Sequence, residues 1–306
     1  MVYECLLYVL LGVIDLNVLH IYMEKILVKC TGFIGDTLFA SSIAKKLKEQ
    51  DPFRIIDFSI PIAQPLELLY NNPFISKVFL SNDYEEKDYD KIIVTPLVDQ
   101  SITPPRQFQI AAGIKDVDDK FEVYTNPAFD YAAEQSFKET KDKGIKIITW
   151  MSNWEERSYI FTEDQYKAGI DVPNLGYGGK HRDIKFITNS LSEKYALLEV
   201  GFANGVNQFS TGLNTAATYS FTASLIKAAD CFIGSEGGLA NLAAGVGTKT
   251  IITGDFVHQL YGWNGVIKKI KEPKLGPKFY FGENNHTTLD PYLTDKEVVD
   301  KIKELV

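Results

Sequence analysis

Histidine and cysteine are scarce in this sequence. The chain of 306 residues has four histidines and three cysteines, with no Cys-x-x-Cys pair. Zinc sites and disulfide-stapled folds need clusters of these residues, so we expect neither a metal site nor a structural disulfide. Two of the cysteines, Cys30 and Cys231, lie in apolar runs where cysteine behaves as a small hydrophobic residue, and Cys5 is distant from both. We therefore expect a reducing compartment, the cytoplasm.

An excess of positive charge is also lacking. The chain has 32 lysines and arginines against 40 aspartates and glutamates, a formal net charge of −8. Proteins that bind nucleic acid present basic surfaces, so nucleic acid is excluded as a main partner. One stretch, 268–278, holds five lysines. It is either a solvated face or a surface for peripheral contact with an anionic inner membrane.

A long, uncharged apolar run is missing too. Residues 1–22 are apolar, but they include Glu4, Asp15 and His20, and no positive charge precedes them. This pattern fits neither a signal peptide nor a membrane span. Two interpretations stay open: an extension upstream of a native start at Met23, or an extra helix packed on the domain that follows.

From residue 23 onward, apolar strand-like runs alternate with amphipathic stretches, which predicts parallel sheets covered by helices. In the first part, strands are expected at 26–30, 54–60, 77–80 and 91–95, and helices at 36–50, 64–71, 105–113 and 129–141. In the second part, strands are expected at 145–150, 195–200 and 248–253, and helices at 183–192, from 220, and at 294–305. Thr294 and Glu297 form a capping-box pattern. We expect an α/β protein with units at 23–142 and 143–306.

The first motif is the turn after the first strand, Thr31-Gly32-Phe33-Ile34-Gly35-Asp36. It lacks the Gly-x-Gly-x-x-Gly spacing, which weakens a nicotinamide interpretation. From the residues alone, Asp36 fits a helix N-cap, since aspartate at a helix start after glycine is common.

The second motif follows the apolar run 231–234 and comprises Ser235, Glu236, Gly237 and Gly238 before a helix. Glycines let the backbone approach a bound group, and a helix N-terminus suits a phosphate. A carboxylate such as Glu236 suits sugar hydroxyls. The structural alternative is a simple turn and cap.

Together, the two motifs resemble glycosyltransferase family 9, the ADP-heptose:lipopolysaccharide heptosyltransferases and their relatives. The resemblance implies the GT-B fold, two Rossmann-like domains facing each other across a cleft. It places Asp36 on the general base that faces the acceptor, Glu236 on the acid that contacts the donor sugar, and Gly237 and Gly238 near the diphosphate.

Further residues are placed by the same resemblance. Lys180 and Arg182 fall near the basic residue on the donor phosphates, and Ser152 and Asn153 would face the cleft. Ser235 and Asn241 complete the expected donor-binding set, and Thr31, Gly32 and Gly35 form the acceptor-side loop. Asn241 stands where the family has histidine, and Thr149-Trp150-Met151-Ser152 replaces its His-Pro-Gly. These departures leave the donor open.

The resemblance implies an inverting glycosyltransferase, without metal or cofactor, that moves a sugar from a nucleotide-diphosphate sugar to a saccharide or lipid-linked acceptor. One alternative is a non-catalytic sugar-nucleotide or glycan-binding module of the same fold. Another is an epimerase of the UDP-N-acetylglucosamine 2-epimerase type, whose cluster of acidic and histidine residues this sequence lacks.

Overall fold

The computed structural model describes most of the chain between residues 23 and 306. The described ranges are 23–32, 34–63, 65–80, 83–96, 102–151, 159–160, 180–201, 206–209, 214–216, 218–235, 237–253, 286–289 and 293–306. The apolar stretch 1–22 and the lysine-bearing stretch 268–278 lie outside these ranges, so the expectations for them stay predictions. Within the described parts, no helix is long and apolar enough to cross a membrane.

The first unit is a four-stranded parallel sheet with strand order β3-β2-β1-β4. Its strands are β1 (Lys25–Lys29), β2 (Ile55–Ile60), β3 (Lys77–Leu80) and β4 (Lys91–Val94). Its helices are α3 (Ile34–Ala40), α4 (Ser42–Gln50), α5 (Leu66–Tyr70) and α6 (Pro104–Ala111), with a 3-10 turn at Glu86–Asp88. The apolar centre of β1, which predicted a buried strand, is fully covered by its neighbours.

One helix expected in this unit is divided in two. The apolar periodicity predicts a single helix at 36–50, but α3 ends at Ala40 and α4 begins at Ser42. The hydroxyl of Ser41 donates to the Leu38 carbonyl at 2.7 Å, and that of Ser42 donates to the Phe39 carbonyl at 2.8 Å. Hydroxyls that bind back to the preceding turn compete with regular helix geometry, which accounts for the break.

The second unit is a seven-stranded sheet in the order β10-β9-β8-β5-β11-β12-β13, parallel from β8 to β13 and antiparallel at β9 and β10. Its strands are β5 (Ile147–Met151), β8 (Ala196–Val200), β9 (Val206–Phe209), β10 (Asn214–Ala216), β11 (Cys231–Gly234), β12 (Thr250–Ile252) and β13 (His286–Thr288). Its helices are α10 (Ile184–Ser192), α11 (Tyr219–Ala228), α12 (Gly238–Gly245) and α15 (Asp295–Leu305). The expected capping box of α15 is confirmed, since Thr294 and Glu297 exchange both hydrogen bonds. The alternation therefore predicted the α/β class correctly.

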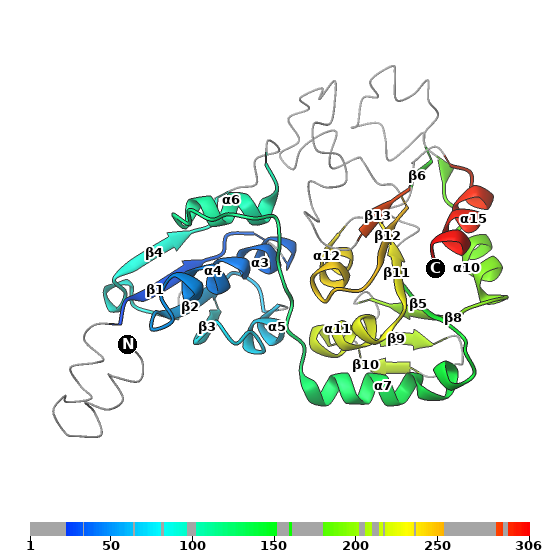
Figure 1. Ribbon diagram of the computed structural model, residues 1–306, viewed down its shortest axis with the longest axis horizontal. Helices are drawn as coiled ribbons and strands as arrows, with labels where there is room; N and C mark the ends of the chain where they lie inside the picture. The colour runs from blue at the N-terminus through cyan, green and yellow to red at the C-terminus, as the bar shows by residue number, and fades with distance from the viewer. Residues whose placement is uncertain are drawn as a thin grey trace, which may run out of the picture.

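Helix α7 (Pro127–Asp142) lies with the second sheet, beneath α11 (Figure 1). Phe129 of α7 packs edge-on against Phe221 of α11, with 5.7 Å between ring centroids. Asp130 accepts hydrogen bonds from Ser224 and Lys227, both at 2.7 Å. The expected boundary near residue 142 follows this helix, whereas the chain leaves the first sheet earlier, along residues 114–126, which we name the crossover segment (Figure 1).

Both cysteines in the described ranges are free and buried. Burial raises the pKa of the Cys30 thiol, and the nearby Asp36 carboxylate adds to this effect. Burial likewise raises the pKa of Cys231 to about 12. Both behave as core residues, in line with the apolar runs that contain them.

Candidate functional site

The turn after β1 fixes the position of Asp36. The Thr31 backbone amide donates to the Thr95 hydroxyl at 3.1 Å, and the Thr31 hydroxyl donates to the Thr95 carbonyl at 2.9 Å. These bonds tie the turn to the end of β4. Asp36 then folds back over Gly32, where a Cβ atom would lie only 2.1 Å from the Asp36 Oδ2. Residue 32 must therefore be glycine for the carboxylate to occupy this place.

Thr95 itself was not singled out from the sequence. One feature of the sequence could have pointed to it: a polar residue directly after an apolar strand lies at the carboxyl edge of a parallel sheet, where ligands bind. Thr95 is buried, with 2% of its surface exposed.

The turn after β11 opens helix α12. Gly237 has φ of 154°, a conformation that residues with a side chain rarely adopt, and it occupies the N-cap position of α12. Gly237 has no side chain to cap the first amide groups of the helix, and a helix N-terminus with its positive dipole end suits an acceptor such as a phosphate. Ser235, just before this turn, is fully buried.

Helices α3 and α12 bring the two motifs together, although about two hundred residues separate them in sequence. The two helices lie side by side between the sheets (Figure 1). A Cβ atom on Gly35 would lie 2.6 Å from Asn241 Nδ2, and a Cβ atom on Gly238 would lie 3.7 Å from Ile34. The turn that carries Asp36 thus meets the first turn of α12.

Asn241 is buried at this contact. Its side chain and backbone are 4% exposed, and its Oδ1 atom has no hydrogen-bond partner among the described residues. A buried acceptor without a partner costs about 1–3 kcal/mol, which a ligand hydroxyl or a water molecule would offset. Asn241 is therefore a candidate contact for a donor group at the α12 turn.

Arg182 has a different environment from the one the resemblance implies. It is 1% exposed, and its guanidinium donates to the carbonyls of Thr253 at 3.2 Å and Leu293 at 2.8 Å. It also forms an ion pair with Asp295 at 3.3 Å. These partners join the end of β12 to the start of α15, which is a structural role.

The remaining expected residues are only partly placed. Lys180 lies in a two-stranded ribbon of β6 (Tyr159–Ile160) and β7 (Lys180–His181), where it pairs with Ile160. Ser152, Asn153 and Glu236 lie outside the described residues. Within the described ranges, no three His, Cys, Asp or Glu side chains come together as a metal site would require.

Comparison with known proteins identifies relatives by structure alone. No family model matches the chain, and no curated protein sequence matches it. Among solved structures, E. coli ADP-heptose lipopolysaccharide heptosyltransferase II is similar over 92% of this chain and 98% of its own, with a TM-score of 0.58 and 14% identity. A glycosyl transferase of family 9 from Veillonella parvula is similar over 92% and 97%, with a TM-score of 0.62 and 9% identity.

A third similar structure is E. coli heptosyltransferase WaaC with ADP-2-deoxy-2-fluoro heptose, matched over 92% of this chain and 100% of its own, with a TM-score of 0.51 and 10% identity. This chain has the GT-B fold. The resemblance inferred from the two motifs is therefore confirmed at the level of the fold. In this GT-B chain, the contact between α3 and α12 joins the two α/β units.

Proposed function

We propose that the chain is a glycosyltransferase that moves a sugar from a nucleotide-diphosphate sugar to a hydroxyl of a saccharide or lipid-linked acceptor. The observation that carries this proposal is the meeting of the Asp36 turn with the N-terminus of α12, from opposite units of a GT-B fold. The solved structures of the same fold are named as heptosyltransferases or glycosyl transferases, and one is solved with an ADP-sugar analogue. This likeness supports the reaction class and leaves the sugar open.

Asp36 takes the role of general base. Its carboxylate is held over Gly32 at the start of α3. It accepts the proton of the acceptor hydroxyl while the hydroxyl oxygen attacks the anomeric carbon. The bond between that carbon and the diphosphate oxygen breaks, and its electron pair leaves with the nucleotide diphosphate. An in-line displacement of this kind inverts the anomeric centre.

Helix α12 stabilises the leaving diphosphate in this proposal. Its first amide groups and its dipole carry positive charge without a mobile side chain, so they act on the charge that develops in the transition state. Glu236 binds sugar hydroxyls, and the Oδ1 of Asn241, which has no partner among the residues that the structure describes, accepts a hydrogen bond from another hydroxyl. We assign no phosphate contact to Arg182, since its guanidinium already binds β12 and α15.

A thermal-shift screen against ADP, GDP, UDP and CDP and their common sugars tests the donor site. A ligand at a hundred times its dissociation constant stabilises the fold by about 2.7 kcal/mol, a shift that is easily measured. We expect one nucleotide to raise the Tm, and its sugar conjugate to raise it further in the wild type but not in Glu236→Ala. If no nucleotide stabilises a well-folded protein, the donor site at α12 is wrong.

The purified protein and its sugar nucleotide also distinguish a transferase from the two alternatives, a binding module and an epimerase. A binding module would be stabilised by a sugar nucleotide but would release no nucleotide with any acceptor. An epimerase would convert the sugar nucleotide with no acceptor present. Release of nucleotide that depends on an added acceptor is expected only of a transferase.

A further inference from the structure

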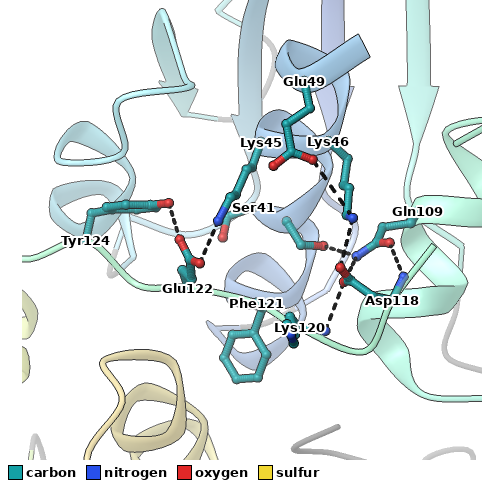
Figure 2. Close-up of a pocket in the computed structure, with 11 residues that line it drawn as sticks. Ser41, Lys45, Lys46, Glu49, Gln109, Asp118, Lys120, Phe121, Glu122 and Tyr124 are labelled. Atoms are coloured by element: carbon teal, nitrogen blue, oxygen red, sulfur yellow. Dashed lines mark hydrogen bonds and ion pairs between the residues drawn. The ribbon is translucent and has the colours of Figure 1, made fainter. Parts of the chain in front are cut away.

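The crossover segment has two different sides. Between residues 118 and 124 the segment has no regular secondary structure, and its side chains contact α4 and α6 on one side and α3 and α12 on the other. Asp118, Lys120, Phe121, Glu122 and Tyr124 line a cavity of about 290 Å³ that α4 and α6 also border (Figure 2). Val123 and the ring edge of Phe121 lie against Gly245 at the end of α12.

The apolar side binds the two units together. The Val123 amide donates to the Gly245 carbonyl at 2.8 Å, which satisfies an acceptor at the C-terminus of α12. A Cβ atom on Gly245 would lie 2.5 Å from Val123 Cγ2 and 2.8 Å from the Phe121 ring. Phe121 also packs edge-on against Phe39 of α3, with 4.9 Å between ring centroids. The segment therefore touches α3 and α12 at once.

The polar side binds the segment to α4. Lys45 forms an ion pair with Glu122 at 2.6 Å, and Lys46 forms one with Asp118 at 2.8 Å (Figure 2). The fully buried Gln109 of α6 accepts a hydrogen bond from the Asp118 amide at 2.9 Å. Charged side chains around a cavity, rather than apolar packing, thus hold this side of the segment.

We infer that residues 118–124 form a strap that positions α12 against α3, and that its two ion pairs with α4 set that position. Helix α12 has eight residues and ends at the strap, while its first turn contacts Ile34 and Gly35, which precede Asp36 in α3. A helix of this length spans about 12 Å as a rigid rod, so a displacement at Gly245 moves Gly238 as well. Lys45, Lys46, Asp118 and Glu122 are positioning residues, remote from the reacting atoms.

Amide hydrogen exchange tests the strap without any substrate, so the test does not depend on the proposed function. The readout is the exchange rate of the Val123 amide and of the α12 amides. Lys45→Glu places two carboxylates together, and we expect roughly three- to tenfold faster exchange at these amides. The amides of α15, which has its own capping box, should keep their rates.

Two further variants should exchange like the wild type, one because it keeps the ion pair and one because it forms the pair again. Lys45→Arg keeps the charge, and the double variant Lys45→Glu/Glu122→Lys reverses the pair, so both should exchange at the wild-type rate. Lys138→Glu is the matched control, because Lys138 forms an ion pair of 2.9 Å with Asp142 within α7, away from the strap. It should leave the Val123 rate unchanged.

Three results would overturn the inference. The first is an unchanged Val123 rate in Lys45→Glu. The second is an equal change in Lys138→Glu, and the third is no restoration in the double variant. Wild-type protein in high salt gives a check without mutation, since screening of these partly exposed pairs should also accelerate Val123 exchange.

Discussion

Two contacts at the junction between the units differ in kind: the packing of α3 against α12, and the packing of the crossover segment against α4. At the site, α3 meets α12 through glycines, with a buried amide pressed against Gly35. At the crossover segment, two ion pairs join the chain to α4 beside a cavity of about 290 Å³. At Gly35, the first contact has no space for an added methyl group unless a neighbour shifts, whereas the second borders a cavity. We therefore expect the position of α12 against α3 to tolerate less change at Gly35 than at the ion pairs of the strap.

The largest loss of stability should come from adding a methyl group at Gly35, in the tight contact between α3 and α12. Gly35→Ala would place a Cβ atom 2.6 Å from the Nδ2 atom of Asn241, so the buried Asn241 side chain or the two helices must shift. Overpacking of this kind costs about 1–3 kcal/mol, measured as a lower free energy of unfolding in denaturant. Gly238→Ala is the matched control on the facing helix, where the nearest atom would be 3.7 Å away. Equal losses in both variants would contradict the account.

A smaller effect is expected at the strap. Lys46→Ala removes an ion pair whose partners are 16% and 32% exposed at their side chains. Partly exposed pairs contribute about 0.2–1 kcal/mol, so the free energy of unfolding should fall by no more than this amount. A loss as large as that of Gly35→Ala would show that the polar side is as rigid as the tight contact.

The smallest effect concerns pH. Burial raises the pKa of Glu122, but hydrogen bonds from Lys45 and Tyr124 outweigh it and hold the pKa below its usual value of 4.5. Burial also raises the pKa of Asp118, but hydrogen bonds from Lys46, Lys120 and Gln109 outweigh this effect and hold the pKa below its usual value of 3.8. A carboxyl with a depressed folded-state pKa stabilises the fold above its unfolded-state pKa, and this stabilisation is lost as the pH falls through the folded-state value.

Glu122→Gln measures this contribution directly. The variant should have a lower Tm than the wild type at pH 7, and the two should converge as the pH falls below 4.5 and through the lowered folded-state pKa of the wild-type carboxyl. A difference in Tm that is constant over this pH range would show that the charge of Glu122 does not stabilise the strap.

Local patterns predicted much of the fold. Strand β3 occupies the expected residues 77–80, and α15 begins with the expected capping box. These elements have strong local signals. Strands β9 and β13 were not expected, because they are short and carry polar residues such as Asn207 and His286. Their pairing partners, rather than their own periodicity, make them strands.

The candidate site was predictable only in its parts. The sequence placed Asp36 and the α12 turn each after an apolar strand, and the structure has both there. The contact between Gly35 and Asn241 could not be predicted, since it depends on how two units pack. The partners of Arg182 were also hidden, because Leu293 and Asp295 lie more than a hundred residues away.

The most direct test of the proposed reaction is the turnover of Asp36→Asn with the donor that the thermal-shift screen identifies. Asparagine keeps the shape of the side chain but cannot take a proton. We expect kcat to fall about 10²–10⁴-fold. The dissociation constant of the donor should not change, because the donor is assigned to α12. Asp142→Asn, on an exposed part of α7, should keep full activity. Wild-type turnover in Asp36→Asn would contradict the assignment of Asp36 as the general base.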